Sequence, residues 1–195
     1  MIGAPERSVI HMILAELTGY YQLPCMLAGG NSNSKTPDMQ AGFEKAMALT
    51  TLLIARGVGI VDGLGAIDSA NTMCAEALVG DNKIASAVMR ACRGLEVNNG
   101  NFAVDVIREV GPGGIFSGQK YTLKHYKTEI WMPEISDKNT YATWQKMGSR
   151  SMDKVAKERV RAILATHKPK PIPEDVEKEI SQIVQRAEAE VLRKS

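Results

Sequence analysis

The amino-acid sequence predicts an α/β protein, with a parallel sheet covered by helices and a helical C-terminal part. A strand, a polar loop and an amphipathic helix follow one another twice within residues 23–94. Both strands are apolar on both faces, which is typical of parallel strands that helices cover on each side. Beyond residue 122 the apolar residues recur only at helical spacing.

A first helix is expected between Pro5 and Gly19. Proline is favoured in the first turn of a helix because the N–H that it lacks would have no partner there. The helical spacing of the apolar residues predicts that this helix buries one face. That face would consist of Val9, Ile10, Ile13, Leu14 and Leu17.

The first repeat of the pattern has a strand at residues 23–28, a polar loop at 29–37 and a helix over about 39–55. The strand is a short apolar run that ends in two glycines, as expected of a buried strand that leads into a loop. Asp38 precedes the helix and is predicted to cap it.

The second repeat has a strand at residues 58–61, a turn at 62–65 and a helix over 69–94. A third unit is expected from a helix at 102–110 and a very short strand at 115–116. The sequence therefore predicts about three units of strand and helix.

The organisation changes after residue 121. Residues 1–121 are expected to form the α/β part, and residues 122–195 a helical extension packed on its outside. The segment 168–173 alternates proline with other residues and predicts a stiff, extended linker between two amphipathic helices. Basic and acidic residues alternate in this region, which favours a solvated helical face.

Composition excludes several classes of protein. The chain has 195 residues, 24 basic and 22 acidic, and its formal charge of +2 gives no electrostatic reason to expect binding to nucleic acid or an anionic membrane. The sequence holds neither a signal-peptide pattern nor an apolar run of membrane-spanning length. We expect a cytoplasmic, reduced protein, because its three cysteines are far apart, at Cys25, Cys74 and Cys92.

Ligands of parallel α/β sheets bind at the carboxyl ends of the strands, and the segments 29–35, 62–68 and 113–119 are expected to occupy that position here. The first loop is either a ligand cradle or a flexible surface connection. Asp62 either faces a pocket or serves as a turn residue, since Asp-Gly is a turn dipeptide. Asp68 is interpreted as a helix cap.

Nucleotide, metal and nucleophile signatures are absent from the sequence. It has neither the phosphate-loop pattern nor correctly spaced glycines of a dinucleotide fingerprint, and a nucleotide-binding domain is the least favoured alternative. No nucleophile elbow is present. The histidines are expected to lie far from the three loops, which predicts no metal site. His125 alone is close enough in sequence to approach the third loop, although a structural role is favoured for it.

Several stretches together resemble the C-terminal portion of the trimethylamine methyltransferase family, the MttB-like corrinoid-dependent enzymes. The resemblance covers nearly the whole chain and is most specific in residues 24–35 and 105–114. Its motifs are Gly3-Ala4-Pro5-Glu6, Tyr20-Tyr21-Gln22-Leu23-Pro24, Ala28-Gly29-Gly30 with Ser34-Lys35 and Asp38, Gln40-Ala41-Gly42, Asp62-Gly63, the run from Asp105 to Gly114, Thr122-Leu123-Lys124-His125, and Trp131 with Pro133.

This resemblance implies the last few βα units of a TIM-type barrel, followed by C-terminal helices, without the N-terminal part of the barrel. It implies that a methyl group passes from a methylated amine to the Co(I) of a corrinoid carried by a separate, cognate corrinoid protein, so that no cofactor or metal is bound directly. The loops would line the barrel mouth, with no catalytic residue assigned. The substrate-binding residues would be Gly29, Gly30, Asn31, Ser32, Asp62, Gly63, Phe116, Gln119 and Tyr121.

Two departures from the family pattern narrow the expected substrate. Every residue is standard, whereas the trimethylamine enzymes use pyrrolysine, so the resemblance favours the branch without pyrrolysine and a quaternary amine as substrate. Asp62 stands where many relatives are expected to have histidine. The loops are poor in aromatic residues that would surround a cation, with Phe116 and Tyr121 the best placed.

The sequence leaves a second function class open, a truncated and non-catalytic relative that serves in assembly or ligand binding. Half a barrel has two strand edges that must pair with something. Either reading therefore predicts a homo-oligomer, or pairing with the missing N-terminal part.

Overall fold

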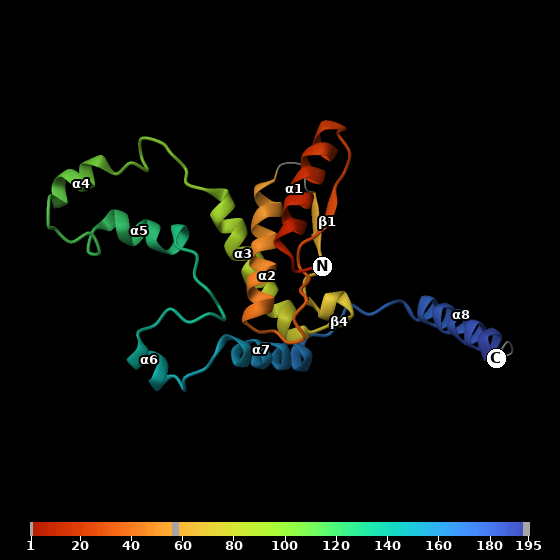
Figure 1. Ribbon diagram of the computed structural model, residues 1–195. Helices are drawn as coiled ribbons and strands as arrows, with labels where there is room; N and C mark the ends of the chain where they lie inside the picture. The colour runs from red at the N-terminus through yellow and green to blue at the C-terminus, as the bar shows by residue number, and fades with distance from the viewer. Residues whose placement is uncertain (1, 56–58, 193–195) are drawn as a thin grey trace. The chain divides into compact units, whose positions relative to one another are not determined.

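The computed structural model describes residues 2–55 and 59–192. They form a mostly helical α/β structure with few, short strands (Figure 1). The elements are α1 (Pro5–Tyr20), β1 (Met26–Ala28), α2 (Met39–Ile54), β2 (Ile60–Asp62), β3 (Ala66–Ile67), β4 (Thr72–Met73), α3 (Ala75–Arg93), α4 (Val104–Val110), α5 (Lys120–Glu129), α6 (Tyr141–Lys146), α7 (Met152–Thr166) and α8 (Glu174–Leu192).

The strands β1 and β2 are parallel neighbours on either side of α2 in the sequence. Met26 pairs with Ile60, and Ala28 pairs with Asp62. The alternation of strand and helix that the sequence predicts is therefore confirmed for this pair. A second, antiparallel pair of two-residue strands, β3 and β4, follows β2 directly. Val58, which was expected to open the second strand, lies outside the described residues.

The strand predicted at residues 115–116 is wrong, because both residues are irregular in the structure. Ile115 is largely exposed and pairs with no other strand in the described ranges. A run of two residues has too few backbone hydrogen bonds to form a strand unless a neighbouring strand holds it. The described residues accordingly show two strand–helix units in place of three, and no closed barrel.

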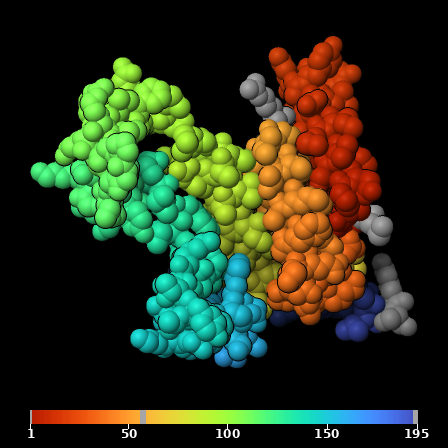
Figure 2. Space-filling view, turned by 60° about the vertical axis from the view of Figure 1, so that its left-hand side comes forward, coloured from red at the N-terminus to blue at the C-terminus, as the bar shows by residue number. Residues whose placement is uncertain are grey.

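The helices α1, α2 and α3 stand side by side, as Figures 1 and 2 both show, with α2 in the middle. The apolar core lies along α2, where Leu49 and Leu52 are almost completely buried. Leu52 packs close to Gly29, where an added Cβ would meet its Cδ1 at 2.6 Å. This contact brings the end of β1 directly against α2.

A buried ion pair joins α2 to α3. Lys45 Nζ lies 2.6 Å from Asp81 Oδ2, and the side chains of Lys45 and Asp81 are only 0% and 5% exposed. Asp81 also accepts a hydrogen bond of 2.7 Å from the backbone N–H of Gly65. Burial raises the pKa of the Asp81 carboxyl, while the hydrogen bonds from Lys45 and Gly65 oppose that rise. The pair fixes the turn after β2 to both helices.

The buried face of α1 differs from the predicted one. Ser8, His11 and Ala15 are buried, whereas the five apolar residues expected to be buried are exposed. Helix α1 packs against α2, and its buried side chains are small or polar. The apolar stripe, which normally marks the core-facing side of a helix, is therefore exposed here. The exposed apolar face consists of Val9, Ile10, Ile13, Leu14 and Leu17.

The helix predicted over 69–94 begins six residues later, at Ala75. The strands β3 and β4 and a left-handed turn between them occupy residues 66–73. The Cys74 thiol caps α3 and accepts a hydrogen bond from the N–H of Ala77. Asp68, expected to be a helix cap, lies in that turn instead, so this interpretation is corrected. Asp38 caps α2 as predicted, through a 3.0 Å bond from the N–H of Ala41.

The later residues are helical as expected, with short helices α4 to α6 and longer helices α7 and α8. Two compact units are present, residues 1–161 and 162–195, and the predicted division at residue 121 stays a prediction. In the second unit, α8 carries an apolar stripe that includes Ile180 and Ile183. Within the described ranges, the structure has no helix that could span a membrane.

Candidate functional site

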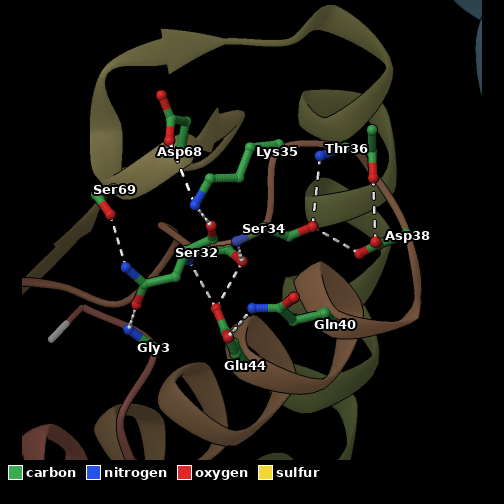
Figure 3. Close-up of polar contacts among 11 residues, drawn as sticks. Gly3, Ser32, Ser34, Lys35, Thr36, Asp38, Gln40, Glu44, Asp68 and Ser69 are labelled. Atoms are coloured by element: carbon green, nitrogen blue, oxygen red, sulfur yellow. Dashed lines mark hydrogen bonds and ion pairs between the residues drawn. The ribbon is translucent and has the colours of Figure 1, made fainter.

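The loop after β1 is organised around the buried carboxylate of Glu44 on α2. Glu44 accepts hydrogen bonds from the Ser32 hydroxyl at 2.6 Å, the Asn33 N–H at 2.8 Å and the Gln40 side-chain amide at 2.7 Å. Figure 3 shows these contacts beneath the loop. Because Ser32 and Asn33 of the loop both donate to this one buried carboxylate, the loop has a fixed shape, in contrast to a flexible surface connection.

Hydrogen bonding decides the charge of Glu44. Burial alone raises the pKa of this carboxyl, but the bonds from Ser32, Gln40 and Asn33 outweigh burial and hold the pKa below its usual value. The side chain is therefore a carboxylate at neutral pH. It acts as the acceptor that organises the loop, and its oxygens are already occupied by protein donors.

A left-handed turn after β3 closes over the same loop. Asp68, Ser69 and Ala70 have φ values of 50°, 58° and 71°, although none of them is glycine. Such a conformation costs roughly 1–2 kcal/mol for each residue. Four contacts to the loop hold it. Two are backbone hydrogen bonds, from Asp68 N–H to Ser34 O and from Ser69 N–H to Ser32 O. Two are side-chain contacts, between the Asn33 amide and the Ser69 hydroxyl and between the Lys35 ammonium and the Asp68 carboxylate (Figure 3).

Gly30 allows the ends of β1 and β2 to meet. A Cβ added at Gly30 would lie 2.4 Å from the backbone nitrogen of Leu64, so a side chain cannot fit. The Gly30 N–H donates to the Asp62 carbonyl at 2.8 Å. Gly63, at φ 85°, lies against Asn31. Five of the predicted residues, Gly29, Gly30, Asn31, Asp62 and Gly63, therefore meet at one end of the sheet.

Two side chains of α1 reach the same end of the sheet. Arg7 Nη1 donates to the Asn31 side-chain oxygen at 2.8 Å and to the carbonyl of Ile2 at 3.1 Å. Arg7 Nε lies 3.4 Å from His11 Nε2. Arg7 and His11 both interact electrostatically with Asp62, the exposed carboxylate at the end of β2.

The expectation that the histidines lie far from the loops is thus wrong for His11. Its imidazole is buried, and burial, reinforced by the charge of Arg7, lowers its pKa despite the opposing charge of Asp62. The ring is therefore neutral at pH 7. Its Nδ1 atom is buried and has no hydrogen-bond partner. A buried polar atom without a partner is uncommon and is a reason to consider a ligand.

The three predicted residues of the third loop are not joined to this end of the sheet by any hydrogen bond between described residues. Phe116 is exposed and Gln119 precedes α5. Tyr121 stacks on His125 with ring centroids 4.4 Å apart, and its hydroxyl contacts the Asn101 carbonyl at 3.4 Å. Their role in substrate binding stays a prediction.

A mostly apolar hollow of about 950 Å³ lies beside this network, at the starts of α2, α3 and α7. Phe43 and Met152 line it, together with the carboxylates Glu76 and Asp153. Neither Asp62 nor Arg7 lines this hollow, so it is separate from the polar cluster at the end of the sheet. Within the described ranges, no group of three or more histidine, cysteine or acidic side chains could hold a metal ion.

Sequence reasoning missed four side chains that shape this site, namely Arg7, His11, Glu44 and Ser69. Two signals were available. Arg7 and His11 lie four residues apart, as do Gln40 and Glu44, and side chains at that spacing share one face of a helix. No sequence signal marked Ser69, whose conformation depends on contacts with a loop 36 residues earlier.

Comparison with known proteins assigns nearly the whole chain to one family. Residues 1–191 match the family described as trimethylamine methyltransferase (MTTB). The chain is 37% identical over 190 residues to the trimethylamine methyltransferase MttB of Methanosarcina barkeri (strain Fusaro / DSM 804), covering 96% of this chain and 37% of that protein. It is 32% identical over 190 residues to MttB of Desulfitobacterium hafniense (strain DSM 10664 / DCB-2), covering 97% and 38%.

A relative named for a different substrate is nearly as similar. The chain is 30% identical over 190 residues to the glycine betaine methyltransferase of Desulfitobacterium hafniense (strain Y51), covering 97% of this chain and 40% of that protein. The chain thus spans about two fifths of the length of these curated relatives. From the match over residues 1–191, the chain belongs to the trimethylamine methyltransferase family.

Proposed function

We propose that this chain supplies the C-terminal part of a corrinoid-dependent methyltransferase, within a TIM-type barrel, that demethylates a quaternary amine. The family match supports the reaction class. The observation that carries the proposal is the exposed carboxylate of Asp62 at the end of β2, beside a fixed loop. Because every residue is standard, the proposal favours the branch of the family without pyrrolysine.

The chemistry of the substrate agrees with these residues. A quaternary ammonium has no lone pair and cannot bind a proton, so it is already activated to lose a methyl group to a strong nucleophile. The protein then needs chiefly to bind and orient the cation, which lowers the entropic part of the barrier. Asp62 supplies the opposite charge, and the loop held by Glu44 supplies a rigid wall.

The corrinoid is a co-substrate in this proposal. It stays on its cognate corrinoid protein and supplies the Co(I) nucleophile. The methyl carbon takes its new bond from the electron pair of the cobalt, and the C–N pair stays with nitrogen, which leaves as a neutral tertiary amine. The described residues of this chain only need to hold the amine with one methyl group accessible to the partner.

Replacing Asp62 by asparagine is expected to raise the KM for a quaternary amine by up to about fivefold, with a smaller change in kcat. The variant loses the negative charge that holds the cation, and an exposed pair of opposite charges contributes up to about 1 kcal/mol. Methyl transfer is measured by mixing the protein that contains this chain with a Co(I) corrinoid protein and a panel of quaternary amines, and by following the cobalt spectrum and the tertiary amine.

The matched control is Asp105→Asn, which removes an exposed carboxylate of α4 far along the sequence. It is expected to leave KM unchanged. If no amine in a broad panel gives methyl transfer, the proposed reaction is wrong. If Asp62→Asn behaves like the control, the reaction stands but the role of Asp62 does not.

A non-catalytic assembly module is the second candidate function. The apolar face of α1, which includes Ile10 and Ile13, is exposed, and no further strand pairs with β1 or β2 in the described ranges. Such surfaces are typical of contacts with another chain or with further parts of a barrel. Homo-oligomerisation, or pairing with an N-terminal part, is therefore proposed for this face.

Replacing Ile13 by glutamate is expected to lower the molecular mass of the assembly measured by light scattering, because a charge would be buried in the contact. The exposed Glu16→Lys on the same helix is the control. An oligomer that Ile13→Glu dissociates, in a protein without methyl transfer, favours the assembly module. An Ile13→Glu protein with unchanged mass argues against this contact.

A further inference from the structure

Helix α8 exposes a continuous apolar stripe. Val176, Ile180, Ile183 and Val184 lie on one face of the helix and are between 40% and 53% exposed. Among the described residues of α8, none is buried. Helices in proteins obtain most of their stability from packing of the apolar face, so this stripe calls for a partner surface.

The stripe has the spacing of a coiled-coil seam. Val176, Ile180, Ile183 and Ala187 follow one another at intervals of four, three and four residues, which keeps their side chains along one line. The two isoleucines stand in the middle, with a smaller apolar residue on each side. The seam therefore matches itself when a second copy of the helix runs in the opposite direction.

The charges beside the seam favour this antiparallel pairing. Glu179 and Arg186 are seven residues apart, so they lie on the same flank of the stripe. When Ile180 faces Ile183 of the partner subunit, Glu179 lies beside Arg186 of the partner subunit, and the twofold symmetry repeats the contact. A parallel pair would place Glu179 beside Val184 of the partner subunit and would gain no opposite charge. Charges at these positions set the orientation of paired helices.

Both charged side chains are available for such a contact. Arg186 Nε donates to the carbonyl of Gln182 in its own helix at 3.2 Å. Within residues 2–55 and 59–192, no carboxylate pairs with Arg186 and no basic side chain pairs with Glu179. The helix carries six acidic and two basic residues, whereas helices that lie on membrane surfaces are rich in basic residues. A second copy of α8 thus matches this surface better than a lipid surface does.

We propose that α8 binds α8 of a second copy of this chain as an antiparallel pair, with Ile180 and Ile183 at its centre and Glu179 against Arg186 at each end of that centre. The contact is separate from the α1 face and does not depend on methyl transfer, so it goes beyond the proposed function. Because two single helices bury a small area, the association is expected to depend on protein concentration.

The test measures the dissociation constant of the dimer by sedimentation equilibrium of the whole chain. Every sample carries Ile13→Glu, so that the α1 face does not contribute. Glu179→Arg and Arg186→Glu each place like charges at both symmetric contacts, and each is expected to raise the dissociation constant about tenfold. Ile183→Glu is expected to abolish association. Lys178→Glu reverses a charge on the opposite face of α8, and this matched control should leave the constant unchanged.

Mixing the two charge variants tests whether the contact joins separate chains. One partner then has arginine at both positions and the other has glutamate at both, so opposite charges face each other again. The mixture is expected to form a heterodimer as tightly as the unchanged helices form their dimer. The double variant Glu179→Arg with Arg186→Glu should recover self-association for the same reason.

The outcomes decide the inference independently of the enzyme reaction. A monomer at every concentration overturns the pair, as do equal dissociation constants for the charge variants and the control. Weakened association that neither mixing nor the double variant restores also overturns it, because the two charges then do not meet between chains. Circular dichroism verifies that each variant is folded. Methyl transfer by the same samples tests the proposed function separately.

Discussion

Replacing Asp81 by alanine is expected to lower the free energy of unfolding by about 3–5 kcal/mol. The substitution leaves the ammonium of Lys45, which is 0% exposed, without its counter-charge 2.6 Å away. It also leaves the N–H of Gly65 without the acceptor that now lies at 2.7 Å. A buried charge without a partner is one of the few single changes that cost this much.

The measurement is equilibrium unfolding in urea, followed by circular dichroism. Asp105→Ala is the matched control, because it breaks an exposed ion pair with Arg108 on α4. Exposed pairs contribute about 0–1 kcal/mol, so the control should be close to the unchanged protein. The difference between the losses in free energy of unfolding of the two variants gives the contribution of burial.

A double variant tests the reason for this loss. Lys45→Met combined with Asp81→Leu removes both charges, and replacing a buried pair by apolar residues is often neutral or stabilising. We expect it to recover most of the loss, reduced by the unsatisfied N–H of Gly65. If Asp81→Ala costs no more than the control, the ion pair does not hold α2 to α3 in solution.

Replacing Glu44 by glutamine is expected to lower the free energy of unfolding by about 2–3 kcal/mol at pH 7. Glutamine keeps the size of the side chain but loses the charge, and its amide group cannot accept from all three donors. The Asn33 N–H, now bound to Glu44 at 2.8 Å, should exchange its hydrogen faster in the variant. Hydrogen exchange followed by NMR measures that change directly.

The effect of Glu44→Gln depends on pH with a defined sign. Hydrogen bonding lowers the pKa of Glu44 in the folded protein, so its stabilising contribution is complete above the unfolded value of about 4.3. That contribution is lost as the pH falls through the lower, folded pKa. The difference between the two proteins should therefore be largest near pH 7 and shrink below about pH 4. A difference that does not change with pH would contradict the role of the charge.

Glu16→Gln on α1 is the control for this experiment, because Glu16 is exposed and no side chain of the described residues donates a hydrogen bond to it. Its stability should match that of the unchanged protein at each pH. Slower exchange of the Asn33 N–H in Glu44→Gln, or no change, would mean that other contacts fix the loop.

The sequence pattern correctly predicted those helices and strands that depend on neighbouring residues alone. Asp38 caps α2 within the expected bounds, and two apolar runs form parallel strands. The buried face of α1 could not be predicted, because α1 packs on α2 with Ser8 and His11 buried and with its apolar stripe exposed. The start of α3 was missed for a similar reason, since the hairpin before it is held by the distant loop after β1.

Sequence reasoning predicted the site residues whose place follows directly from the ends of the two parallel strands. Asn31 and Asp62 come together because parallel strands end at the same edge of a sheet. Arg7 and His11 were not assigned to the site, because only the packing of α1 places a helix that precedes β1 at that edge. The third loop was expected at the same edge on the assumption of a third strand, which residues 115–116 do not form.

The left-handed turn at Asp68, Ser69 and Ala70 bears on how this protein should be engineered. A search for stabilising substitutions would select glycine at all three positions, because glycine adopts this conformation at little cost. For Asp68 and Ser69 that choice would also delete the side chains that reach Lys35 and Asn33. At Ala70 the side chain is a methyl group that makes no polar contact, so glycine there would remove none. A thermostable version should therefore begin with Ala70→Gly and leave its two neighbours unchanged.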